Sequence, residues 1–185
     1  MDSGKSGVRF SSEREALVLG LGNLSRRDDG LGWFTVNEVR GRLGLARLGE
    51  YDDGLDALGH EVDCAFVPQL APELAEVAAQ YRRLVIVDVR VTGDDGIEAS
   101  KITGELAAVR LLSHELSAGD FVSLIEGLYH CHPCAYLVSV KGHDYDFGVG
   151  LSSEVAAVLP EVVEEVLALV GRRPSGKSGV RFSSE

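Results

Sequence analysis

The chain has 185 residues, of which 45% are hydrophobic and 25% charged, as expected for a globular protein of about one domain. Its formal net charge of −11 argues against nucleic acid or an anionic membrane as the main partner, because phosphates are bound by basic clusters. Three cysteines are too few for the disulfide framework of a small secreted domain. No stretch approaches the ~20 apolar residues of a membrane span, and the first 15 residues lack the apolar core of a signal peptide, so we expect a cytoplasmic protein.

Apolar periodicity predicts strands and helices that alternate along the chain. In order, these are a strand at 16–19, a helix at 32–43, strands at 62–67 and 84–87 with a helix at 72–81 between them, a strand at 105–112, a helix at 119–129, a strand at 135–140 and a helix at 152–170. Residues 44–59 and 91–96 are predicted to be loops. The order predicts an α/β fold with a mostly parallel sheet and helices on both faces. Ligands bind beyond the carboxyl ends of such strands, here after Leu19, after Val87 and around residues 111–118.

The last predicted helix has start signals that leave two possibilities open. Ser152 or Ser153 can serve as its N-cap, because a hydroxyl oxygen there accepts a hydrogen bond from a free backbone N–H. Pro160 falls inside the apolar pattern and is expected either to kink the helix or to mark a late start.

The two ends of the chain repeat the same eleven residues, SGKSGVRFSSE, at 3–13 and 175–185. These segments have too few apolar residues to offset chain entropy, so we expect flexible tails at 1–15 and 171–185 around one domain at 16–170. The second copy completes the phosphate-loop pattern G-x-x-x-x-G-K-S at 171–178. Because that loop requires a helix after it and only seven residues follow, nucleotide binding is not expected there.

A glycine-rich block, G-L-G-N-L-S-R-R-D-D-G-L-G, follows the first strand at 20–32. It departs from the dinucleotide-binding fingerprint, whose third glycine would fall at Ser25, and the second strand does not end on an acidic residue. Asp28 and Asp29 stand before the first helix, where one carboxylate can cap backbone N–H groups. A single cap requires only one carboxylate, so the other of these two aspartates is available to bind a cation or a water molecule.

Two further polar residues stand near predicted strand ends. Asp88 follows the strand at 84–87, and a carboxylate there is expected to be capped by the next loop or solvated at the sheet's edge. His114, in L-L-S-H-E-L, follows the predicted strand at 105–112. A turn role for Asp88 and a surface or supporting role for His114 remain alternatives. Two carboxylates and an imidazole at strand ends would suit a divalent transition metal with open coordination positions.

Four patterns in this order resemble the hydrogenase maturation proteases, endopeptidases that trim the large subunit of nickel–iron hydrogenases. They are the G-L-G-N-L-x-x-x-D-D-G-L-G block, V-I-V-D in mid-chain, S-H-E-L, and the ending G-x-G-L-S-S-E-V-x-x-x-L-P-x-V-V. The resemblance covers residues 16–170 and implies a three-layer α/β/α sandwich with a mixed five-stranded sheet.

The resemblance also implies a site and a substrate. Asp29, Asp88 and His114 match the metal-binding and catalytic positions, and Asn23 matches a position expected to hold the loop. The implied substrate is a large-subunit precursor whose own nickel is bound by the protease only in the complex, and the protease is expected to be a monomer. The nickel or a carboxylate-held water would assist hydrolysis of the C-terminal extension.

Some features fit this interpretation poorly or leave alternatives. Arg90, two residues after Asp88, is expected to weaken a nearby cation site. The segment H-C-H-P-C at 130–134 could be an ordinary loop, a zinc site or a redox pair. No G-x-S-x-G, C-G-x-C-W or H-E-x-x-H pattern indicates another peptidase mechanism. A non-catalytic binding module of the same fold and a dinucleotide-dependent enzyme remain alternatives.

Overall fold

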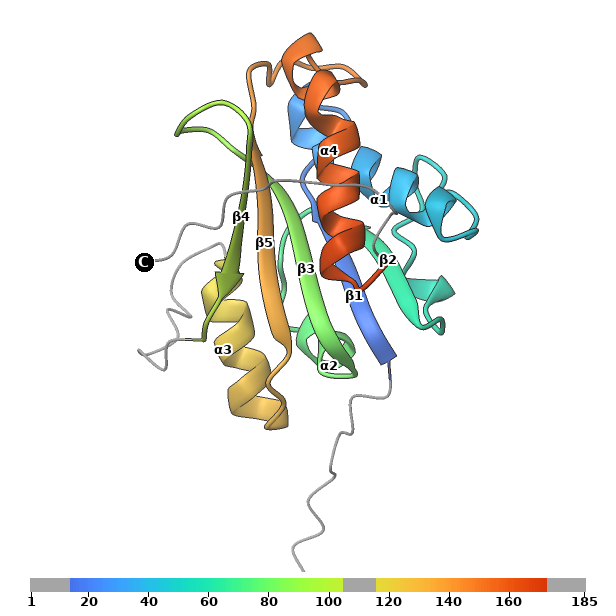
Figure 1. Ribbon diagram of the computed structural model, residues 1–185, viewed down its shortest axis with the longest axis vertical. Coiled ribbons are helices and arrows are strands. Elements are labelled where there is room, and N and C mark those ends of the chain that lie inside the picture. Colours follow the sequence, from blue (N-terminus) through green and yellow to red (C-terminus); the bar gives the residue numbers. More distant parts are fainter. Residues whose placement is uncertain (1–13, 105–115, 173–185) are drawn as a thin grey trace, which may run out of the picture.

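A five-stranded sheet lies at the centre of the structure, a computed structural model that describes residues 14–104 and 116–172 (Figure 1). Its strands are β1 (Arg14–Leu21), β2 (Val62–Val67), β3 (Tyr81–Arg90), β4 (Ile97–Ile102) and β5 (Cys134–Lys141). The strand order is β2-β1-β3-β5-β4, with parallel pairing throughout except between β4 and β5. The predicted mixed, mostly parallel five-stranded sheet is therefore confirmed.

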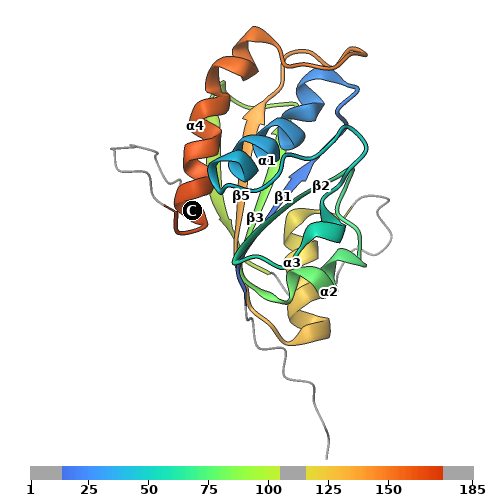
Figure 2. The same ribbon diagram turned by 90° about the vertical axis from the view of Figure 1, so that its right-hand side faces the viewer.

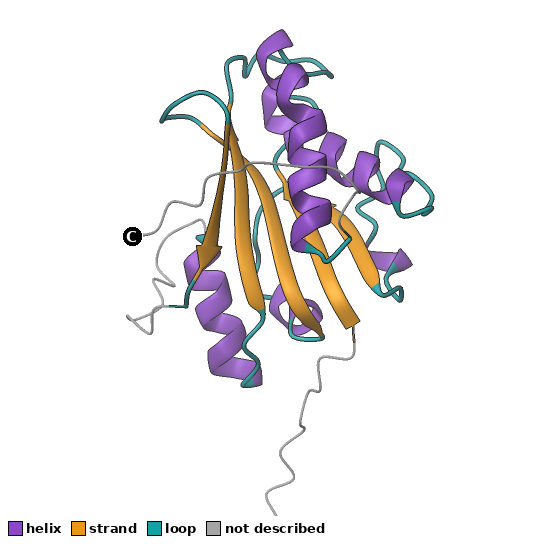
Figure 3. Cartoon of the chain, in the orientation of Figure 1, coloured by secondary structure: helices purple, strands orange, loops and turns teal. Residues whose placement is uncertain are grey.

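Helices cover both faces of the sheet, as predicted (Figures 2 and 3). They are α1 (Leu31–Arg42), α2 (Leu74–Ala78), α3 (Ala118–Tyr129) and α4 (Ser153–Leu169), with 3-10 turns η1 (Arg27–Gly30) and η2 (Leu55–Ala57). Helices α1 and α4 share one face, and α2 and α3 share the other, which makes the three layers of an α/β/α sandwich. No helix within 14–104 and 116–172 is both long enough and apolar enough to span a bilayer.

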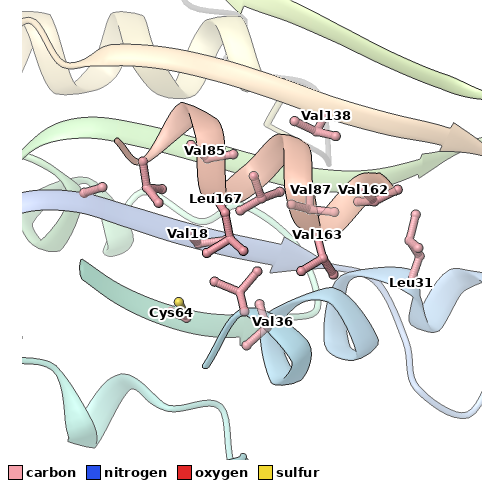
Figure 4. Close-up of a cluster of buried hydrophobic side chains, with 14 of the residues drawn as sticks. Val18, Leu31, Val36, Cys64, Val85, Val87, Val138, Val162, Val163 and Leu167 are labelled. Carbon is pink, nitrogen blue, oxygen red and sulfur yellow. The ribbon is translucent and has the colours of Figure 1, made fainter. Parts of the chain in front are cut away.

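Strand alternation divides the apolar core between the two faces. Val85 and Val87 pack with side chains of α1 and α4 (Figure 4), whereas Leu84 and Ile86 pack in the second cluster, toward α2 and α3. All four are fully buried, and burial of such a side chain stabilises the fold by roughly 1.5–3 kcal/mol. This two-sided burial explains why the central strands are continuous apolar runs in the sequence.

The start of helix α4 shows which residue is the N-cap and whether Pro160 marks the beginning of the helix. The Ser152 hydroxyl accepts a hydrogen bond from the Val155 N–H at 3.3 Å, so Ser152 is the N-cap. Pro160 lies inside the helix, well after its first residue. The possibility that the helix starts late, at Pro160, is therefore wrong.

The structure also changes the bounds of two predicted elements and adds one strand. Strand β3 continues past Asp88 to Arg90, because this stretch still pairs with β5. The predicted helix at 72–81 shortens to α2, and Tyr81 begins β3. The edge strand β4 lies at 97–102, directly after the predicted loop, and sequence reasoning missed it. Of the predicted tails at 1–15 and 171–185, Arg14 and Glu15 lie in β1. Residues 1–13 and 173–185 of these tails, and the predicted strand at 105–112, lie outside the described residues.

Candidate functional site

The carboxyl ends of β1, β3 and β5 lie at one edge of the sheet, where three connections meet (at the top of Figures 1 and 2). The β1–α1 connection touches the β5–α4 connection through a parallel bridge between Arg26 and Gly148. The β3–β4 turn reaches the same place, since the Asp95 carboxylate forms an ion pair with Lys141 at 3.2 Å and lies 3.5 Å from the His143 ring. This is the edge at which ligands bind in sheets of this class.

Glycines let the β1–α1 turn fold closely onto the end of β1. A Cβ atom on Gly20 would lie 2.4 Å from the Gly32 carbonyl oxygen, and one on Gly22 would lie 1.9 Å from the Asp29 carbonyl oxygen. Gly22 also has φ +120°, a backbone conformation that residues other than glycine rarely adopt. The same close approach places the Asp29 carboxylate beside Gly22, with Oδ1 3.4 Å from that Cβ position.

Asn23 holds this turn in the manner that the resemblance implies. Its side-chain oxygen accepts a hydrogen bond from the Ser25 N–H at 2.9 Å. Its own backbone N–H donates to the Asp29 carbonyl oxygen at 3.0 Å. Both ends of the turn are thereby fixed through one residue, which does not itself present a reactive group.

Asp28 is completely buried and ties the turn to the β5–α4 connection. Its carboxylate accepts hydrogen bonds from the backbone N–H groups of His143, Asp144 and Ser152 at 2.7–2.9 Å, and from the Ser152 hydroxyl at 2.8 Å. Burial raises the pKa of Asp28, but these hydrogen bonds outweigh it and leave the pKa below its usual value. Of the two adjacent aspartates, Asp28 therefore has the structural role.

Asp29 is only partly buried and lies in the η1 turn before α1. Burial raises the pKa of Asp29 above its usual value, opposed by the positive charge of Arg26 and by the Asn23 N–H. A carboxylate whose ionised form is incompletely stabilised by the protein gains more from an arriving cation than one already satisfied. The ionised form of Asp29 is incompletely stabilised in this way, whereas that of Asp28 is fully hydrogen-bonded.

Asp88 lies on β3 at the same edge. The parallel pairing of β1 with β3 ends at Gly20 opposite Val87, so Asp88 is one residue beyond the last pair. One of its carboxylate oxygens accepts a hydrogen bond from the Val89 N–H at 2.8 Å. This contact lies within β3, so the expected capping of Asp88 by the next loop stays a prediction.

Tyr145, in the β5–α4 connection, lies close enough to three aspartates for their charges to act on its hydroxyl. Burial raises the pKa of Tyr145, and the charges of Asp28, Asp29 and Asp88 raise it further. Its hydroxyl donates a hydrogen bond to the Arg90 carbonyl oxygen at 3.1 Å, which fixes the ring beside β3. The structure thus brings Asp29 and Asp88 to the surroundings of one phenol.

Sequence reasoning missed Tyr145. The available signal was G-V-G at 148–150, because closely spaced glycines indicate a connection with a special backbone rather than a passive loop. That signal marks the connection without indicating that Tyr145 turns toward β3.

The third predicted site residue, His114, lies outside the described residues. Within 14–104 and 116–172, no group of three or more His, Cys, Asp or Glu side chains is placed to hold a metal ion. The set Asp29, Asp88 and His114 therefore stays a prediction, of which the structure describes the two carboxylates.

Arg90 is held by groups of the β3–β4 turn, β4 and β5. Its guanidinium donates to the carbonyl oxygens of Ser139 and Gly96 at 2.9 and 3.2 Å and forms an ion pair with Glu98 at 3.2 Å. Because Glu98 offsets its charge, the expected weakening of a cation site at Asp88 is reduced.

The H-C-H-P-C segment lies away from this edge, at the amino end of β5. The Cys131 thiol donates to the Tyr129 carbonyl oxygen, and the His132 ring lies 3.3 Å from the Glu126 carboxylate. Both cysteines of the segment are free thiols, as is Cys64. Burial raises the pKa of Cys64 to about 12, which keeps that thiol protonated and unreactive at neutral pH.

No protein-family model and no curated protein matches the chain. Solved structures do. The hydrogenase maturating endopeptidase HybD from E. coli is 21% identical, with a TM-score of 0.60 over 83% of this chain and 90% of that one. The [NiFe] hydrogenase maturation protease HybD from Thermococcus kodakarensis is 20% identical, with a TM-score of 0.58 over 84% and 99% of the two chains. The resemblance seen in the sequence is thereby confirmed at the level of the fold.

The electrostatic role of Arg26 can be tested directly. We expect Arg26→Gln to raise the pKa of Asp29, because it removes the positive charge that favours the ionised carboxylate. A carbon-detected NMR titration of the Asp29 carboxyl group measures this, and added salt should reduce the difference between the two proteins. Arg47→Gln, which removes an arginine paired with Glu38, serves as the control. A fall in the Asp29 pKa in Arg26→Gln would contradict the assignment.

Proposed function

We propose that the protein is an endopeptidase that removes the C-terminal extension from the large-subunit precursor of a nickel–iron hydrogenase. The observation that carries the proposal is the convergence of Asp29 and Asp88 near Tyr145, at the ligand-binding edge of the sheet. The fold shared with hydrogenase maturation endopeptidases supports the same reaction class.

The two carboxylates are suited to recognising nickel that the precursor itself carries. Oxygen donors from the β1–α1 connection and from β3 can complete the coordination of an ion already held by the substrate, and His114 would supply a nitrogen donor. Arg26 favours the ionised form of Asp29 before the substrate arrives. A precursor without nickel would lack this anchor.

Recognition through the metal would also place the scissile peptide at the sheet edge. Holding the reacting groups in position can lower the barrier by several kcal/mol, and a divalent ion near the peptide carbonyl polarises it toward attack by water. In the hydrolysis, water adds to the carbonyl carbon, the peptide C–N bond breaks, and the leaving amine takes up a proton.

The structure disfavours the dinucleotide alternative. In dinucleotide-binding folds, the pyrophosphate lies at the N-terminus of the first helix, where backbone N–H groups face its negative charge. Here η1 places Asp28 and Asp29 immediately before α1. Two carboxylates there oppose a phosphate group by charge.

The proposal predicts that trimming depends on the metal of the substrate. Incubation of the purified protein with nickel-loaded precursor should give the shorter large subunit on a gel, and nickel-free precursor should stay uncut. Equal trimming of both forms of the precursor would contradict the proposed recognition of nickel. Binding of the loaded precursor without any trimming would instead indicate a non-catalytic module.

A further inference from the structure

The β5–α4 connection exposes two large apolar side chains beside the candidate site. Phe147 is 89% exposed and Val149 is 61% exposed. They lie two residues apart, Phe147 being the second residue after Tyr145, and we call them the apolar tip. The tip belongs to the orange connection that lies next to the start of α1 (at the top of Figure 2).

The apolar tip is carried on a firmly held backbone. The Arg27 N–H donates to the Gly148 carbonyl oxygen, and the Gly148 N–H donates to the Ser25 carbonyl oxygen, both at 2.9 Å. The Arg26 guanidinium donates to the Tyr145 carbonyl oxygen at 3.2 Å. With Asp28 holding both ends of the connection, the tip is fixed from several sides before any partner binds.

Two glycines set the direction of the tip. Gly148 has φ +145° and Gly150 has φ +127°, so both residues that flank Val149 adopt conformations rare for other amino acids. The backbone is therefore shaped specifically where Val149 is presented to solvent. A connection required only to join β5 to α4 would need neither this shape nor exposed apolar groups.

Arg26 joins the tip to the acidic site. Its guanidinium carbon lies 5.9 Å from the centroid of the Phe147 ring, and its backbone carbonyl oxygen accepts a hydrogen bond from the Asp29 N–H at 3.0 Å. One residue thus contacts both Phe147 and Asp29, so the tip lies beside the site.

We propose that the apolar tip docks the substrate polypeptide, through an extended segment that carries apolar side chains next to the scissile bond. This proposal rests on the proposed function. The area that two side chains can bury falls well short of the ~1,200 Å² buried in a stable dimer. A peptide segment therefore fits the tip better than a second copy of the chain does. The preformed shape lowers the ordering cost of binding.

The test is a double variant, Phe147→Ala with Val149→Ala, assayed on nickel-loaded precursor. We expect KM to rise about 10-fold, equivalent to ~1.4 kcal/mol, with kcat unchanged, because the tip contributes binding and no chemistry. Leu128→Ala is the matched control, since Leu128 is also 61% exposed but lies near the end of α3. The melting temperature should change in neither variant. An unchanged KM in the double variant, or a loss confined to kcat, would overturn the docking proposal.

A binding measurement separates failure of docking from failure of the proposed function. If the wild-type protein does not trim the precursor, the function fails, and calorimetric titration of the protein with loaded precursor still tests the tip. Tighter binding by wild type and Leu128→Ala than by the double variant supports docking. Equal binding by all three, or binding by none, overturns it. Self-association of the wild type that the double variant loses, seen by sedimentation, would assign the tip to a second copy.

Discussion

Replacing Asp29 or Asp88 by asparagine should abolish trimming of the nickel-loaded precursor while leaving the fold intact. Asparagine keeps the shape of the side chain but removes the negative charge and one strong oxygen donor, and a neutral amide is a poor ligand for a divalent transition ion. We expect kcat/KM to fall ~100-fold or more in each variant, as found when a group acting directly in metal-assisted hydrolysis is removed. Initial rates of product formation on a gel measure the effect.

The stability of Asp29→Asn provides an internal check. Because burial penalises the ionised form of Asp29, replacing it by a neutral residue should not lower the free energy of unfolding substantially. Loss of activity without loss of stability separates a functional carboxylate from a structural one. Asp56→Asn, the same chemical change at an exposed position in η2, should alter neither quantity. Full trimming activity in Asp29→Asn would remove this residue from the site.

The sequence alone predicts that one of two adjacent aspartates has a role beyond capping, but it cannot divide the roles by local chemistry. Asp28 and Asp29 have the same side chain, and both precede α1. What separates them is the β5–α4 connection, more than 110 residues further along the chain, in which three backbone N–H groups donate to the Asp28 carboxylate. Contacts of this range are invisible to periodicity, although the family motif places the ligand at Asp29.

In the sheet, too, the apolar pattern of the sequence predicts some strands and misses another. Strands β2, β3 and β5 are predicted because parallel strands buried on both faces are continuous apolar runs. Strand β4 is missed because it pairs only with β5 at the edge, and among its residues only Ala99 is buried. Its sequence, I-E-A-S-K-I, is that of an edge strand with charged residues facing solvent.

Removing the Asp28 carboxylate should produce the largest loss of stability among the substitutions considered. Asp28→Ala leaves three backbone N–H groups and one hydroxyl without their acceptor in a fully buried position. Each unsatisfied buried donor costs about 1–3 kcal/mol, and partial entry of water reduces the sum. We expect the free energy of unfolding to fall by about 3 kcal/mol at pH 7, measured by urea denaturation. Asp146→Ala, an exposed position in the same connection, should stay within ~0.5 kcal/mol of wild type.

The pH dependence of this difference identifies the ionised carboxylate as its source. The folded protein holds the pKa of Asp28 below its ordinary value of 3.8, so the carboxylate stabilises the fold fully above that pH and loses its contribution as the pH falls through the lower folded pKa. The gap between wild type and Asp28→Ala should therefore be constant from pH 7 to pH 5 and narrow in more acidic solution. A gap that stays the same down to the acid limit of folding would indicate lost packing instead. The same acid range should loosen the connection that carries Tyr145 and Phe147, because the Asp28 carboxylate binds both of its ends.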